Sequence, residues 1–116
     1  MIKELFAKDV VNKYGDFTIP EARGTGGMVM VKADWCGHCR RALPELEKVS
    51  NLTGMAYPIY KIDADKNKEL VSSMGVNGFP TIMFIERDGK VSVKYEGERE
   101  SKSILDKICK KARKCY

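Results

Sequence analysis

The alternation of apolar and polar residues predicts a strand–helix–strand core in the middle of the chain. Residues 28–31 form a continuous apolar run after a glycine pair, which is typical of a strand buried on both faces. Residues 36–53 carry apolar side chains at the spacing of one helix face, and Gly54 ends that pattern. A second apolar run at 81–85 predicts another buried strand.

Weaker patterns predict the remaining elements and complete a fold. The predicted helices lie within 3–13, at 65–74 with Asp65 as N-cap and Gly75 as its stop, and from Ser101 to the C-terminus. The predicted strands are a short one at 17–19, one at 57–62, and a half-exposed one with Val91, Val93 and Tyr95 on one face. A turn is predicted at Asp88-Gly89. This order needs a parallel β-α-β crossover followed by an antiparallel hairpin. We therefore predict an α/β fold, in which a central mixed β-sheet is flanked by helices on both faces. Residues 1–116 form one domain, and 1–27 are the part that the pattern defines least.

Composition and charge exclude several classes of protein. The chain has 116 residues, of which 43% are hydrophobic and 32% charged, unlike a disordered or collagen-like chain. No stretch reaches the roughly 18 apolar residues of a membrane span, and the first residues lack the apolar core of a signal peptide. We expect a monomer in a cytoplasmic or otherwise unaddressed setting, although a leader removed before residue 1 would allow an oxidising lumen.

The net charge of +5 is confined to the end of the chain. Residues 101–116 hold six basic side chains and one acidic one, whereas residues 1–100 hold equal numbers of each. Lysines near a helix C-terminus complement its dipole and keep its outer face solvated. We therefore expect a solvated face here rather than a surface that binds nucleic acid or an acidic membrane. A salt-sensitive shift in the mobility of DNA would favour binding to nucleic acid instead.

Two of the four cysteines, Cys109 and Cys115, lie in this basic segment. If both are helical, they are separated by about 9 Å along the axis. That distance exceeds what a disulfide tolerates, so we expect two free thiols unless the last turn unwinds. A regulatory or intermolecular disulfide through Cys115 is the alternative.

The other two cysteines, Cys36 and Cys39, form a Cys-x-x-Cys element between a predicted strand and the helix that follows. Unpaired N–H groups and the macrodipole at a helix start stabilise a thiolate, which is the nucleophilic form of cysteine. A protonated His38 would add a positive charge. A zinc site would need four ligands, for which only His38, Cys109 and Cys115 remain. A structural disulfide across so short a loop would gain little entropy.

Residues 33–39, Ala-Asp-Trp-Cys-Gly-His-Cys, resemble the active-site motif of the thioredoxin superfamily. The Gly-His pair is similar to that of protein disulfide isomerases, since thioredoxin itself has Gly-Pro at this place. Further matches are Pro44 in the following helix, residues 61–63 at the end of a central strand, the 75–81 segment as a cis-proline loop, and residues 95–100 at the entry to the last helix. The resemblance covers about residues 28–114 and implies a thioredoxin fold.

The resemblance also implies roles for particular residues. The catalytic residues implied are Cys36 as the attacking thiol and Cys39 as the resolving thiol. Gly37, His38 and Arg99 complete the catalytic site around them. The substrate-binding group is Trp35, Gly78, Phe79 and Pro80, with Pro80 in a cis peptide bond facing the cysteines. Taken without the resemblance, Trp35 and Phe79 would be ordinary core residues and Arg99 a solvated loop residue. No metal and no bound cofactor is implied, because the two cysteines carry the electrons.

One departure from the family stands out. The family places a buried acid beneath the resolving cysteine, and a lysine beside that acid. Here Met30 and Ile59 occupy the two positions. No unpaired charge is left in the core, so the fold should not suffer. The proton acceptor for Cys39 is missing, so we expect Cys39 to resolve mixed disulfides slowly.

The sequence therefore predicts a thiol–disulfide oxidoreductase of disulfide-isomerase type, acting on protein or peptide thiols and disulfides. In a reducing compartment the pair would work as a reductase or isomerase, and in an oxidising one it could donate disulfides. A reductase or an oxidase would serve as its redox partner. The alternatives are a binding module on the same scaffold, and a redox carrier dedicated to one partner with weak general activity.

Overall fold

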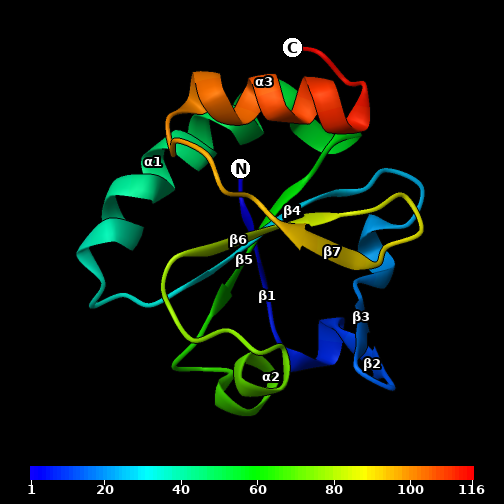
Figure 1. Ribbon diagram of the computed structural model, residues 1–116, viewed down its shortest axis with the longest axis vertical. Helices are drawn as coiled ribbons and strands as arrows, with labels where there is room; N and C mark the ends of the chain where they lie inside the picture. Colours follow the sequence, from blue (N-terminus) through cyan, green and yellow to red (C-terminus); the bar gives the residue numbers. More distant parts are fainter.

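A five-stranded mixed sheet forms the middle layer of the protein, which the computed structural model describes over residues 1–116. In spatial order its strands are β1 (Lys3–Leu5), β5 (Ile59–Asp63), β4 (Gly27–Lys32), β6 (Thr81–Ile85) and β7 (Val91–Lys94). Strand β5 runs parallel to both of its neighbours, whereas β6 is antiparallel to β4 and β7 is antiparallel to β6. The predicted α/β fold with a mixed sheet is confirmed (Figure 1).

Helices cover both faces of this sheet, as the sequence predicts. Figure 1 shows α1 (Gly37–Thr53) and α3 (Ser101–Ala112) side by side on one face and α2 (Lys68–Ser73) at the other. Successive side chains of a strand point to opposite faces. Met28 and Met30 of β4 accordingly pack into the core under α1 and α3, while Val29 and Val31 pack into the core on the α2 side. None of the helices has the length and apolar character that crossing a bilayer requires.

The N-terminal region departs from its prediction. Residues 3–13 are not helical: β1 is followed by a 3-10 turn, Ala7–Asp9, and by β2 (Val11–Lys13). Strand β1 is only three residues long and exists because it pairs with β5 from far along the chain, which no local periodicity reveals. Strand β3 (Asp16–Thr18), predicted one residue later, forms a hairpin with β2. Two more 3-10 turns, Pro20–Ala22 and Gly54–Ala56, precede β4 and follow α1.

Two predicted details in the second half of the chain are wrong. Asp65 does not cap α2, because its N–H and that of Lys66 donate to the Asp63 carboxylate in a turn before the helix; Asn67 takes the N-cap position. Val93 does not share a buried face with Val91 and Tyr95, since 57% of it is exposed. An irregularity in the β6–β7 pairing shifts the register and breaks the alternation.

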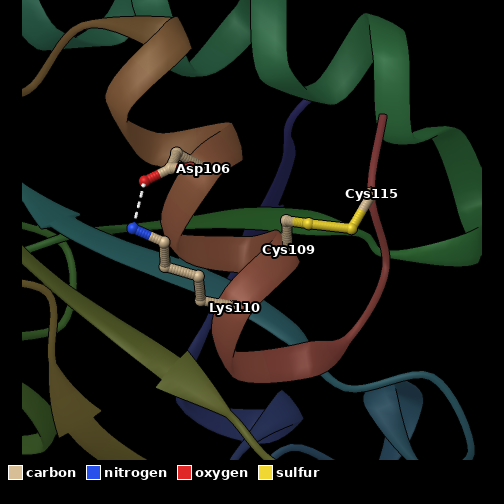
Figure 2. Close-up of a disulfide and its surroundings, with 4 residues drawn as sticks. All are labelled: Asp106, Cys109, Lys110 and Cys115. Atoms are coloured by element: carbon tan, nitrogen blue, oxygen red, sulfur yellow. Dashed lines mark ion pairs between the residues drawn. A yellow bond between two sulfur atoms is a disulfide. The ribbon is translucent and has the colours of Figure 1, made fainter.

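The C-terminus holds a disulfide between Cys109 and Cys115, so the expectation of two free thiols is wrong. Helix α3 ends at Ala112, and Arg113 adopts a left-handed conformation with φ of 57° that turns the chain back. The two Cα atoms thereby come within 4.3 Å of each other. Figure 2 shows the bond between the two sulfur atoms. The exception that we allowed for, an unwound last turn, is what the structure has.

Most of the lysines in this segment form ion pairs or hydrogen bonds with other groups of the chain. Lys110 pairs with Asp106 at 3.0 Å, as Figure 2 also shows, and Lys111 pairs with Glu86 at 3.2 Å. Lys114 donates to the backbone carbonyls of Thr25 and Ala56. Three of the five lysines in residues 101–116 therefore bind groups of the chain itself, which the expectation of a solvated face did not include.

Candidate active site

The first cysteine of the Cys-x-x-Cys element lies at the start of α1. Cys36 is the N-cap residue, with extended backbone angles, and its Sγ accepts a hydrogen bond from the Cys39 N–H at 3.4 Å. This sulfur therefore takes the place that a serine or aspartate oxygen usually occupies at a helix start. Both cysteines are buried and reduced in this structure. The local sequence thus places a thiol where an anion is stabilised.

A loop before β6 faces this sulfur. The Phe79-Pro80 peptide bond is cis, as the sequence predicts, and the Cys36 thiol donates to the Phe79 carbonyl at 3.6 Å. Thr81 closes the loop by donating from its hydroxyl to the Gly78 carbonyl at 2.7 Å. The Phe79 N–H has no hydrogen-bond partner within the chain. An extended peptide therefore finds a backbone donor beside the nucleophile.

Trp35 forms the rim of this site. Its side chain is 66% exposed, so it is not the ordinary core residue that the bare sequence would allow. The indole meets the half-buried Phe79 ring edge to face, with centroids 5.9 Å apart. Its Nε1–H donates to the Asp65 carboxylate at 3.1 Å, which fixes the ring. An exposed, fixed aromatic side chain beside a buried thiol offers an apolar surface to a substrate.

The two thiols differ in acidity. Hydrogen bonds from the Cys39 thiol and from the Cys39 backbone N–H lower the pKa of Cys36 below its usual value. Burial raises the pKa of Cys39 to about 11, and the neighbouring Cys36 sulfur adds to this effect. The geometry thus separates an attacking thiol from one that stays protonated.

This difference predicts selective alkylation of the reduced protein. Because the thiolate is the reactive form, iodoacetamide at neutral pH should modify Cys36 well before Cys39, and the Cys39 rate should rise only as the pH approaches about 11. Peptide mapping after timed quenching measures both rates. Equal rates for the two cysteines at neutral pH would contradict the assignment.

His38 is exposed and contacts an arginine one helical turn further along α1. Its Nδ1 lies 2.8 Å from the Arg41 guanidinium, which can only donate, so the ring accepts a hydrogen bond at this atom. The charge that lowers the pKa of Cys36 electrostatically belongs to Arg40, although the hydrogen bonds described above act more strongly. Arg40 is held by its bond to the Asp34 carbonyl at 2.8 Å. The sequence reading missed both arginines, which follow the motif directly.

Arg99 lies near enough to the resolving cysteine to influence it. Its positive charge acts on the pKa of Cys39 against the larger effect of burial. Arg99 is exposed and lines a cavity of about 290 Å³ together with His38 and Arg41. Gly37 is the first residue of α1 and places no side chain between the two cysteines. The structure thus brings all of the predicted site residues to one end of the molecule.

The core beneath the cysteines contains no acid. Met30 and Ile59 are both buried in the apolar cluster under α1 and α3. A buried ion pair lies elsewhere: Lys32, at the end of β4, donates to Asp63 at 3.2 Å and to the exposed Asp34 at 2.6 Å. Lys32 and Asp63 are register partners at the ends of two parallel strands, so pairing the predicted strand ends could have found them.

Cys109 and Cys115 are bonded to each other, so neither is available as a ligand for a zinc site at Cys36 and Cys39. No group of three or more histidine, cysteine, aspartate or glutamate side chains is arranged to hold a metal ion. What the arrangement can do is exchange disulfides: it has an acidified thiol, a second thiol one helical turn away, and an open backbone edge.

The sequence profile of the Thioredoxin family matches residues 22–110. The chain is also 39% identical over 85 residues to "Protein disulfide-isomerase" of Datisca glomerata, a match that covers 69% of this chain and 17% of that protein. It is 38% identical over 88 residues to "Protein disulfide-isomerase A3" of Gallus gallus, covering 74% of this chain and 17% of that protein. The chain thus spans less than a fifth of the length of these two relatives.

Among solved structures, chloroplastic thioredoxin z has a similar fold, with a TM-score of 0.78. The superposition covers 97% of this chain and 96% of that one, at 23% sequence identity. This likeness extends the fold match to the N-terminal residues that the family profile leaves out.

Proposed function

Because this chain belongs to the thioredoxin family, we propose that it is a thiol–disulfide oxidoreductase that acts on protein or peptide disulfides, in the manner of a disulfide isomerase. One observation carries the proposal: the Cys36 sulfur is the N-cap of α1 and lies 3.6 Å from the Phe79 carbonyl of the cis-proline loop. The thiol whose pKa is lowered therefore lies beside the loop that would bind an extended peptide. Relatives with disulfide-isomerase names support the same activity.

The proposed reaction begins when the Cys36 thiolate attacks one sulfur of a substrate disulfide. A bond forms between Cys36 and that sulfur, and the other substrate sulfur leaves as a thiolate. Cys39 then loses its proton and attacks the Cys36 sulfur, so the substrate leaves reduced and Cys36–Cys39 becomes a disulfide. Two electrons pass from the protein to the substrate. No bound cofactor is required, because the cysteines carry the electrons, and a reductase or oxidase partner would reset the pair.

The substrate segment would bind extended along the loop at Gly78 and Phe79. The free Phe79 N–H would pair with its backbone, as an added strand does at a sheet edge. The exposed face of Trp35 would cover an apolar side chain next to the substrate cysteine. These contacts depend mainly on the substrate backbone rather than on particular side chains. We therefore propose broad specificity for substrate sequence.

Replacement of the attacking thiol tests the proposal. The wild-type chain should catalyse the reduction of insulin by dithiothreitol and the reactivation of ribonuclease with scrambled disulfides. Cys36→Ser should lower both rates by roughly 10³-fold or more, as the loss of a nucleophile does. Cys39→Ser should instead accumulate mixed disulfides, visible on a non-reducing gel.

The absence of an acid at Met30 favours one rival, a scaffold that binds partners without chemistry. The same assays separate the two functions. A wild-type rate no higher than that of Cys36→Ser would refute the oxidoreductase and leave the binding scaffold.

A further inference from the structure

The disulfide between Cys109 and Cys115 has no part in the reaction described above. We propose that it is a second redox centre, which exchanges two electrons with the Cys36/Cys39 pair of another copy of this chain. The tail disulfide is the substrate, and the dithiol of the second copy is its reductant. The inference rests on the proposed function for the Cys36/Cys39 half and adds a substrate for that site.

The tail disulfide is poorly suited to stabilising the fold. It joins residues only six apart in the sequence, so it closes a short loop and restrains little of the unfolded chain. Helix α3 is already anchored by Ile104 and Ile108, which are fully buried against the sheet and α1. The bond ties the last residues to α3 and to nothing else.

The sulfurs are open to attack. Cys115 is exposed and Cys109 half-buried, and both line a cavity of about 610 Å³ with Leu105 and Tyr116. In Figure 2 the bond bridges the helix and the returning tail, and the Lys110 side chain extends away from it towards Asp106. An attacking thiolate can therefore approach the Cys115 sulfur from solvent. Exposed disulfides are the labile ones.

The backbone of the segment that carries Cys115 is open to pairing with another chain. After the turn at Arg113, residues 114–116 are neither helical nor paired in a sheet. The N–H groups of Cys115 and Tyr116 make no hydrogen bond within the chain. The free Phe79 N–H of a second copy could donate to a backbone carbonyl of this short segment, as it would to that of any peptide substrate.

The two redox pairs of one chain cannot meet. Lys114, next to Cys115, donates to the Ala56 carbonyl, just past the C-terminal end of α1. Cys36 stands at the other end of α1, whose 17 residues span about 25 Å. Figure 1 shows the two ends of α1 correspondingly far apart. Exchange between the pairs therefore requires a second molecule.

The exchange balances without any further reagent. The Cys36 thiolate of one copy attacks the Cys115 sulfur of the other, the tail S–S bond breaks, and Cys109 leaves as a thiolate. Cys39 then attacks the Cys36 sulfur and releases Cys115. The first copy ends with a Cys36–Cys39 disulfide, and the second with two free tail thiols.

Two variants of the full chain isolate the two pairs. Cys36→Ser/Cys39→Ser keeps only the tail disulfide, and Cys109→Ser/Cys115→Ser keeps only the site dithiol. We would mix the oxidised first variant, isotope-labelled, with one equivalent of the reduced second variant. Samples quenched in acid and alkylated are read by intact mass. The labelled chain should gain two thiols while the other loses two, much faster than the labelled chain reacts with the same concentration of dithiothreitol.

Failures of the two proposals can be told apart. If no thiols transfer while the Cys109→Ser/Cys115→Ser chain still catalyses insulin reduction, the second redox centre is refuted and the proposed function stands. If that chain is folded by circular dichroism but does not catalyse insulin reduction, the proposed function itself fails. A purified Cys36→Ser/Cys39→Ser chain whose tail cysteines stay as free thiols in air would also refute the second centre. Cys109→Ala/Cys115→Ala provides a second version of the chain that keeps only the site dithiol, for the same exchange.

A trapped intermediate tests which sulfur is attacked. A chain carrying only Cys36 (Cys39→Ser, Cys109→Ser, Cys115→Ser) should form a mixed disulfide with the Cys36→Ser/Cys39→Ser chain. Peptide mapping should find Cys36 joined to Cys115, the exposed partner. A link to Cys109 instead, or no link, would contradict the proposed approach.

Discussion

Met30→Glu is expected to accelerate the resolving step by about 10²-fold at neutral pH, in line with what a well-placed general base contributes. The Met30 side chain is buried and packs in one cluster with Ala42, three residues after Cys39 in α1. A carboxyl group there would have its pKa raised by burial towards neutrality, where a base is most effective. Cys39, whose own pKa is about 11, is the thiol in need of such a base. Stopped-flow measurement of mixed-disulfide breakdown reads this step directly.

Met30→Gln is the matched control, since it has the size and polarity of glutamate without its basicity. Both variants should lose about 2–3 kcal/mol of unfolding free energy, because each buries a polar group in an apolar cluster. Only Met30→Glu should gain rate, and the gain should grow with pH until the new carboxyl is ionised. Equal breakdown rates for the two variants would show that deprotonation of Cys39 does not limit the reaction.

The sequence predicts this fold best where local and tertiary preferences agree. Strand β6 begins and ends at the predicted residues, because a short continuous apolar run predicts a buried strand directly. Strand β1 was misread as helical, since it is three residues long and is fixed only by pairing with β5. The tail was misread for a related reason. Arg113 adopts a left-handed angle without being glycine, so no residue type marks the end of α3.

For the site, motif residues were easier to predict than their neighbours. The placement of Cys36 before a helix follows from residue types, and the cis bond at Pro80 follows from the resemblance of its loop to that of the family. The hydrogen bond between His38 and Arg41 depends on the rotamers of both side chains, which spacing alone does not give. The buried pair of Lys32 and Asp63 depends on the register of two parallel strands, which is a property of the assembled sheet.

Lys32→Met should lower the free energy of unfolding by about 3 kcal/mol at neutral pH, because it leaves the buried Asp63 carboxylate without its cation. The Asp63 side chain is only 3% exposed and that of Lys32 only 11%. Burial alone would raise the pKa of Asp63. The Lys32 ammonium and the N–H groups of Asp65 and Lys66 outweigh it and hold this pKa below its usual value. For a domain of this size the loss corresponds to a fall of about 10 °C in Tm.

The pH dependence separates this electrostatic effect from lost packing. A carboxylate whose pKa is lowered by folding stabilises the native state above its unfolded pKa of about 4, and that contribution disappears as the pH falls through the native value. The gap between wild type and Lys32→Met should therefore be largest at neutral pH and shrink in acid, where Asp63 is protonated in both chains. Lys32→Met/Asp63→Asn is the control, since the amide still accepts from the Asp65 N–H but carries no charge. Its stability should exceed that of Lys32→Met at neutral pH, whereas an additive second loss would show that Asp63 draws its stability from the turn at Asp65 rather than from Lys32.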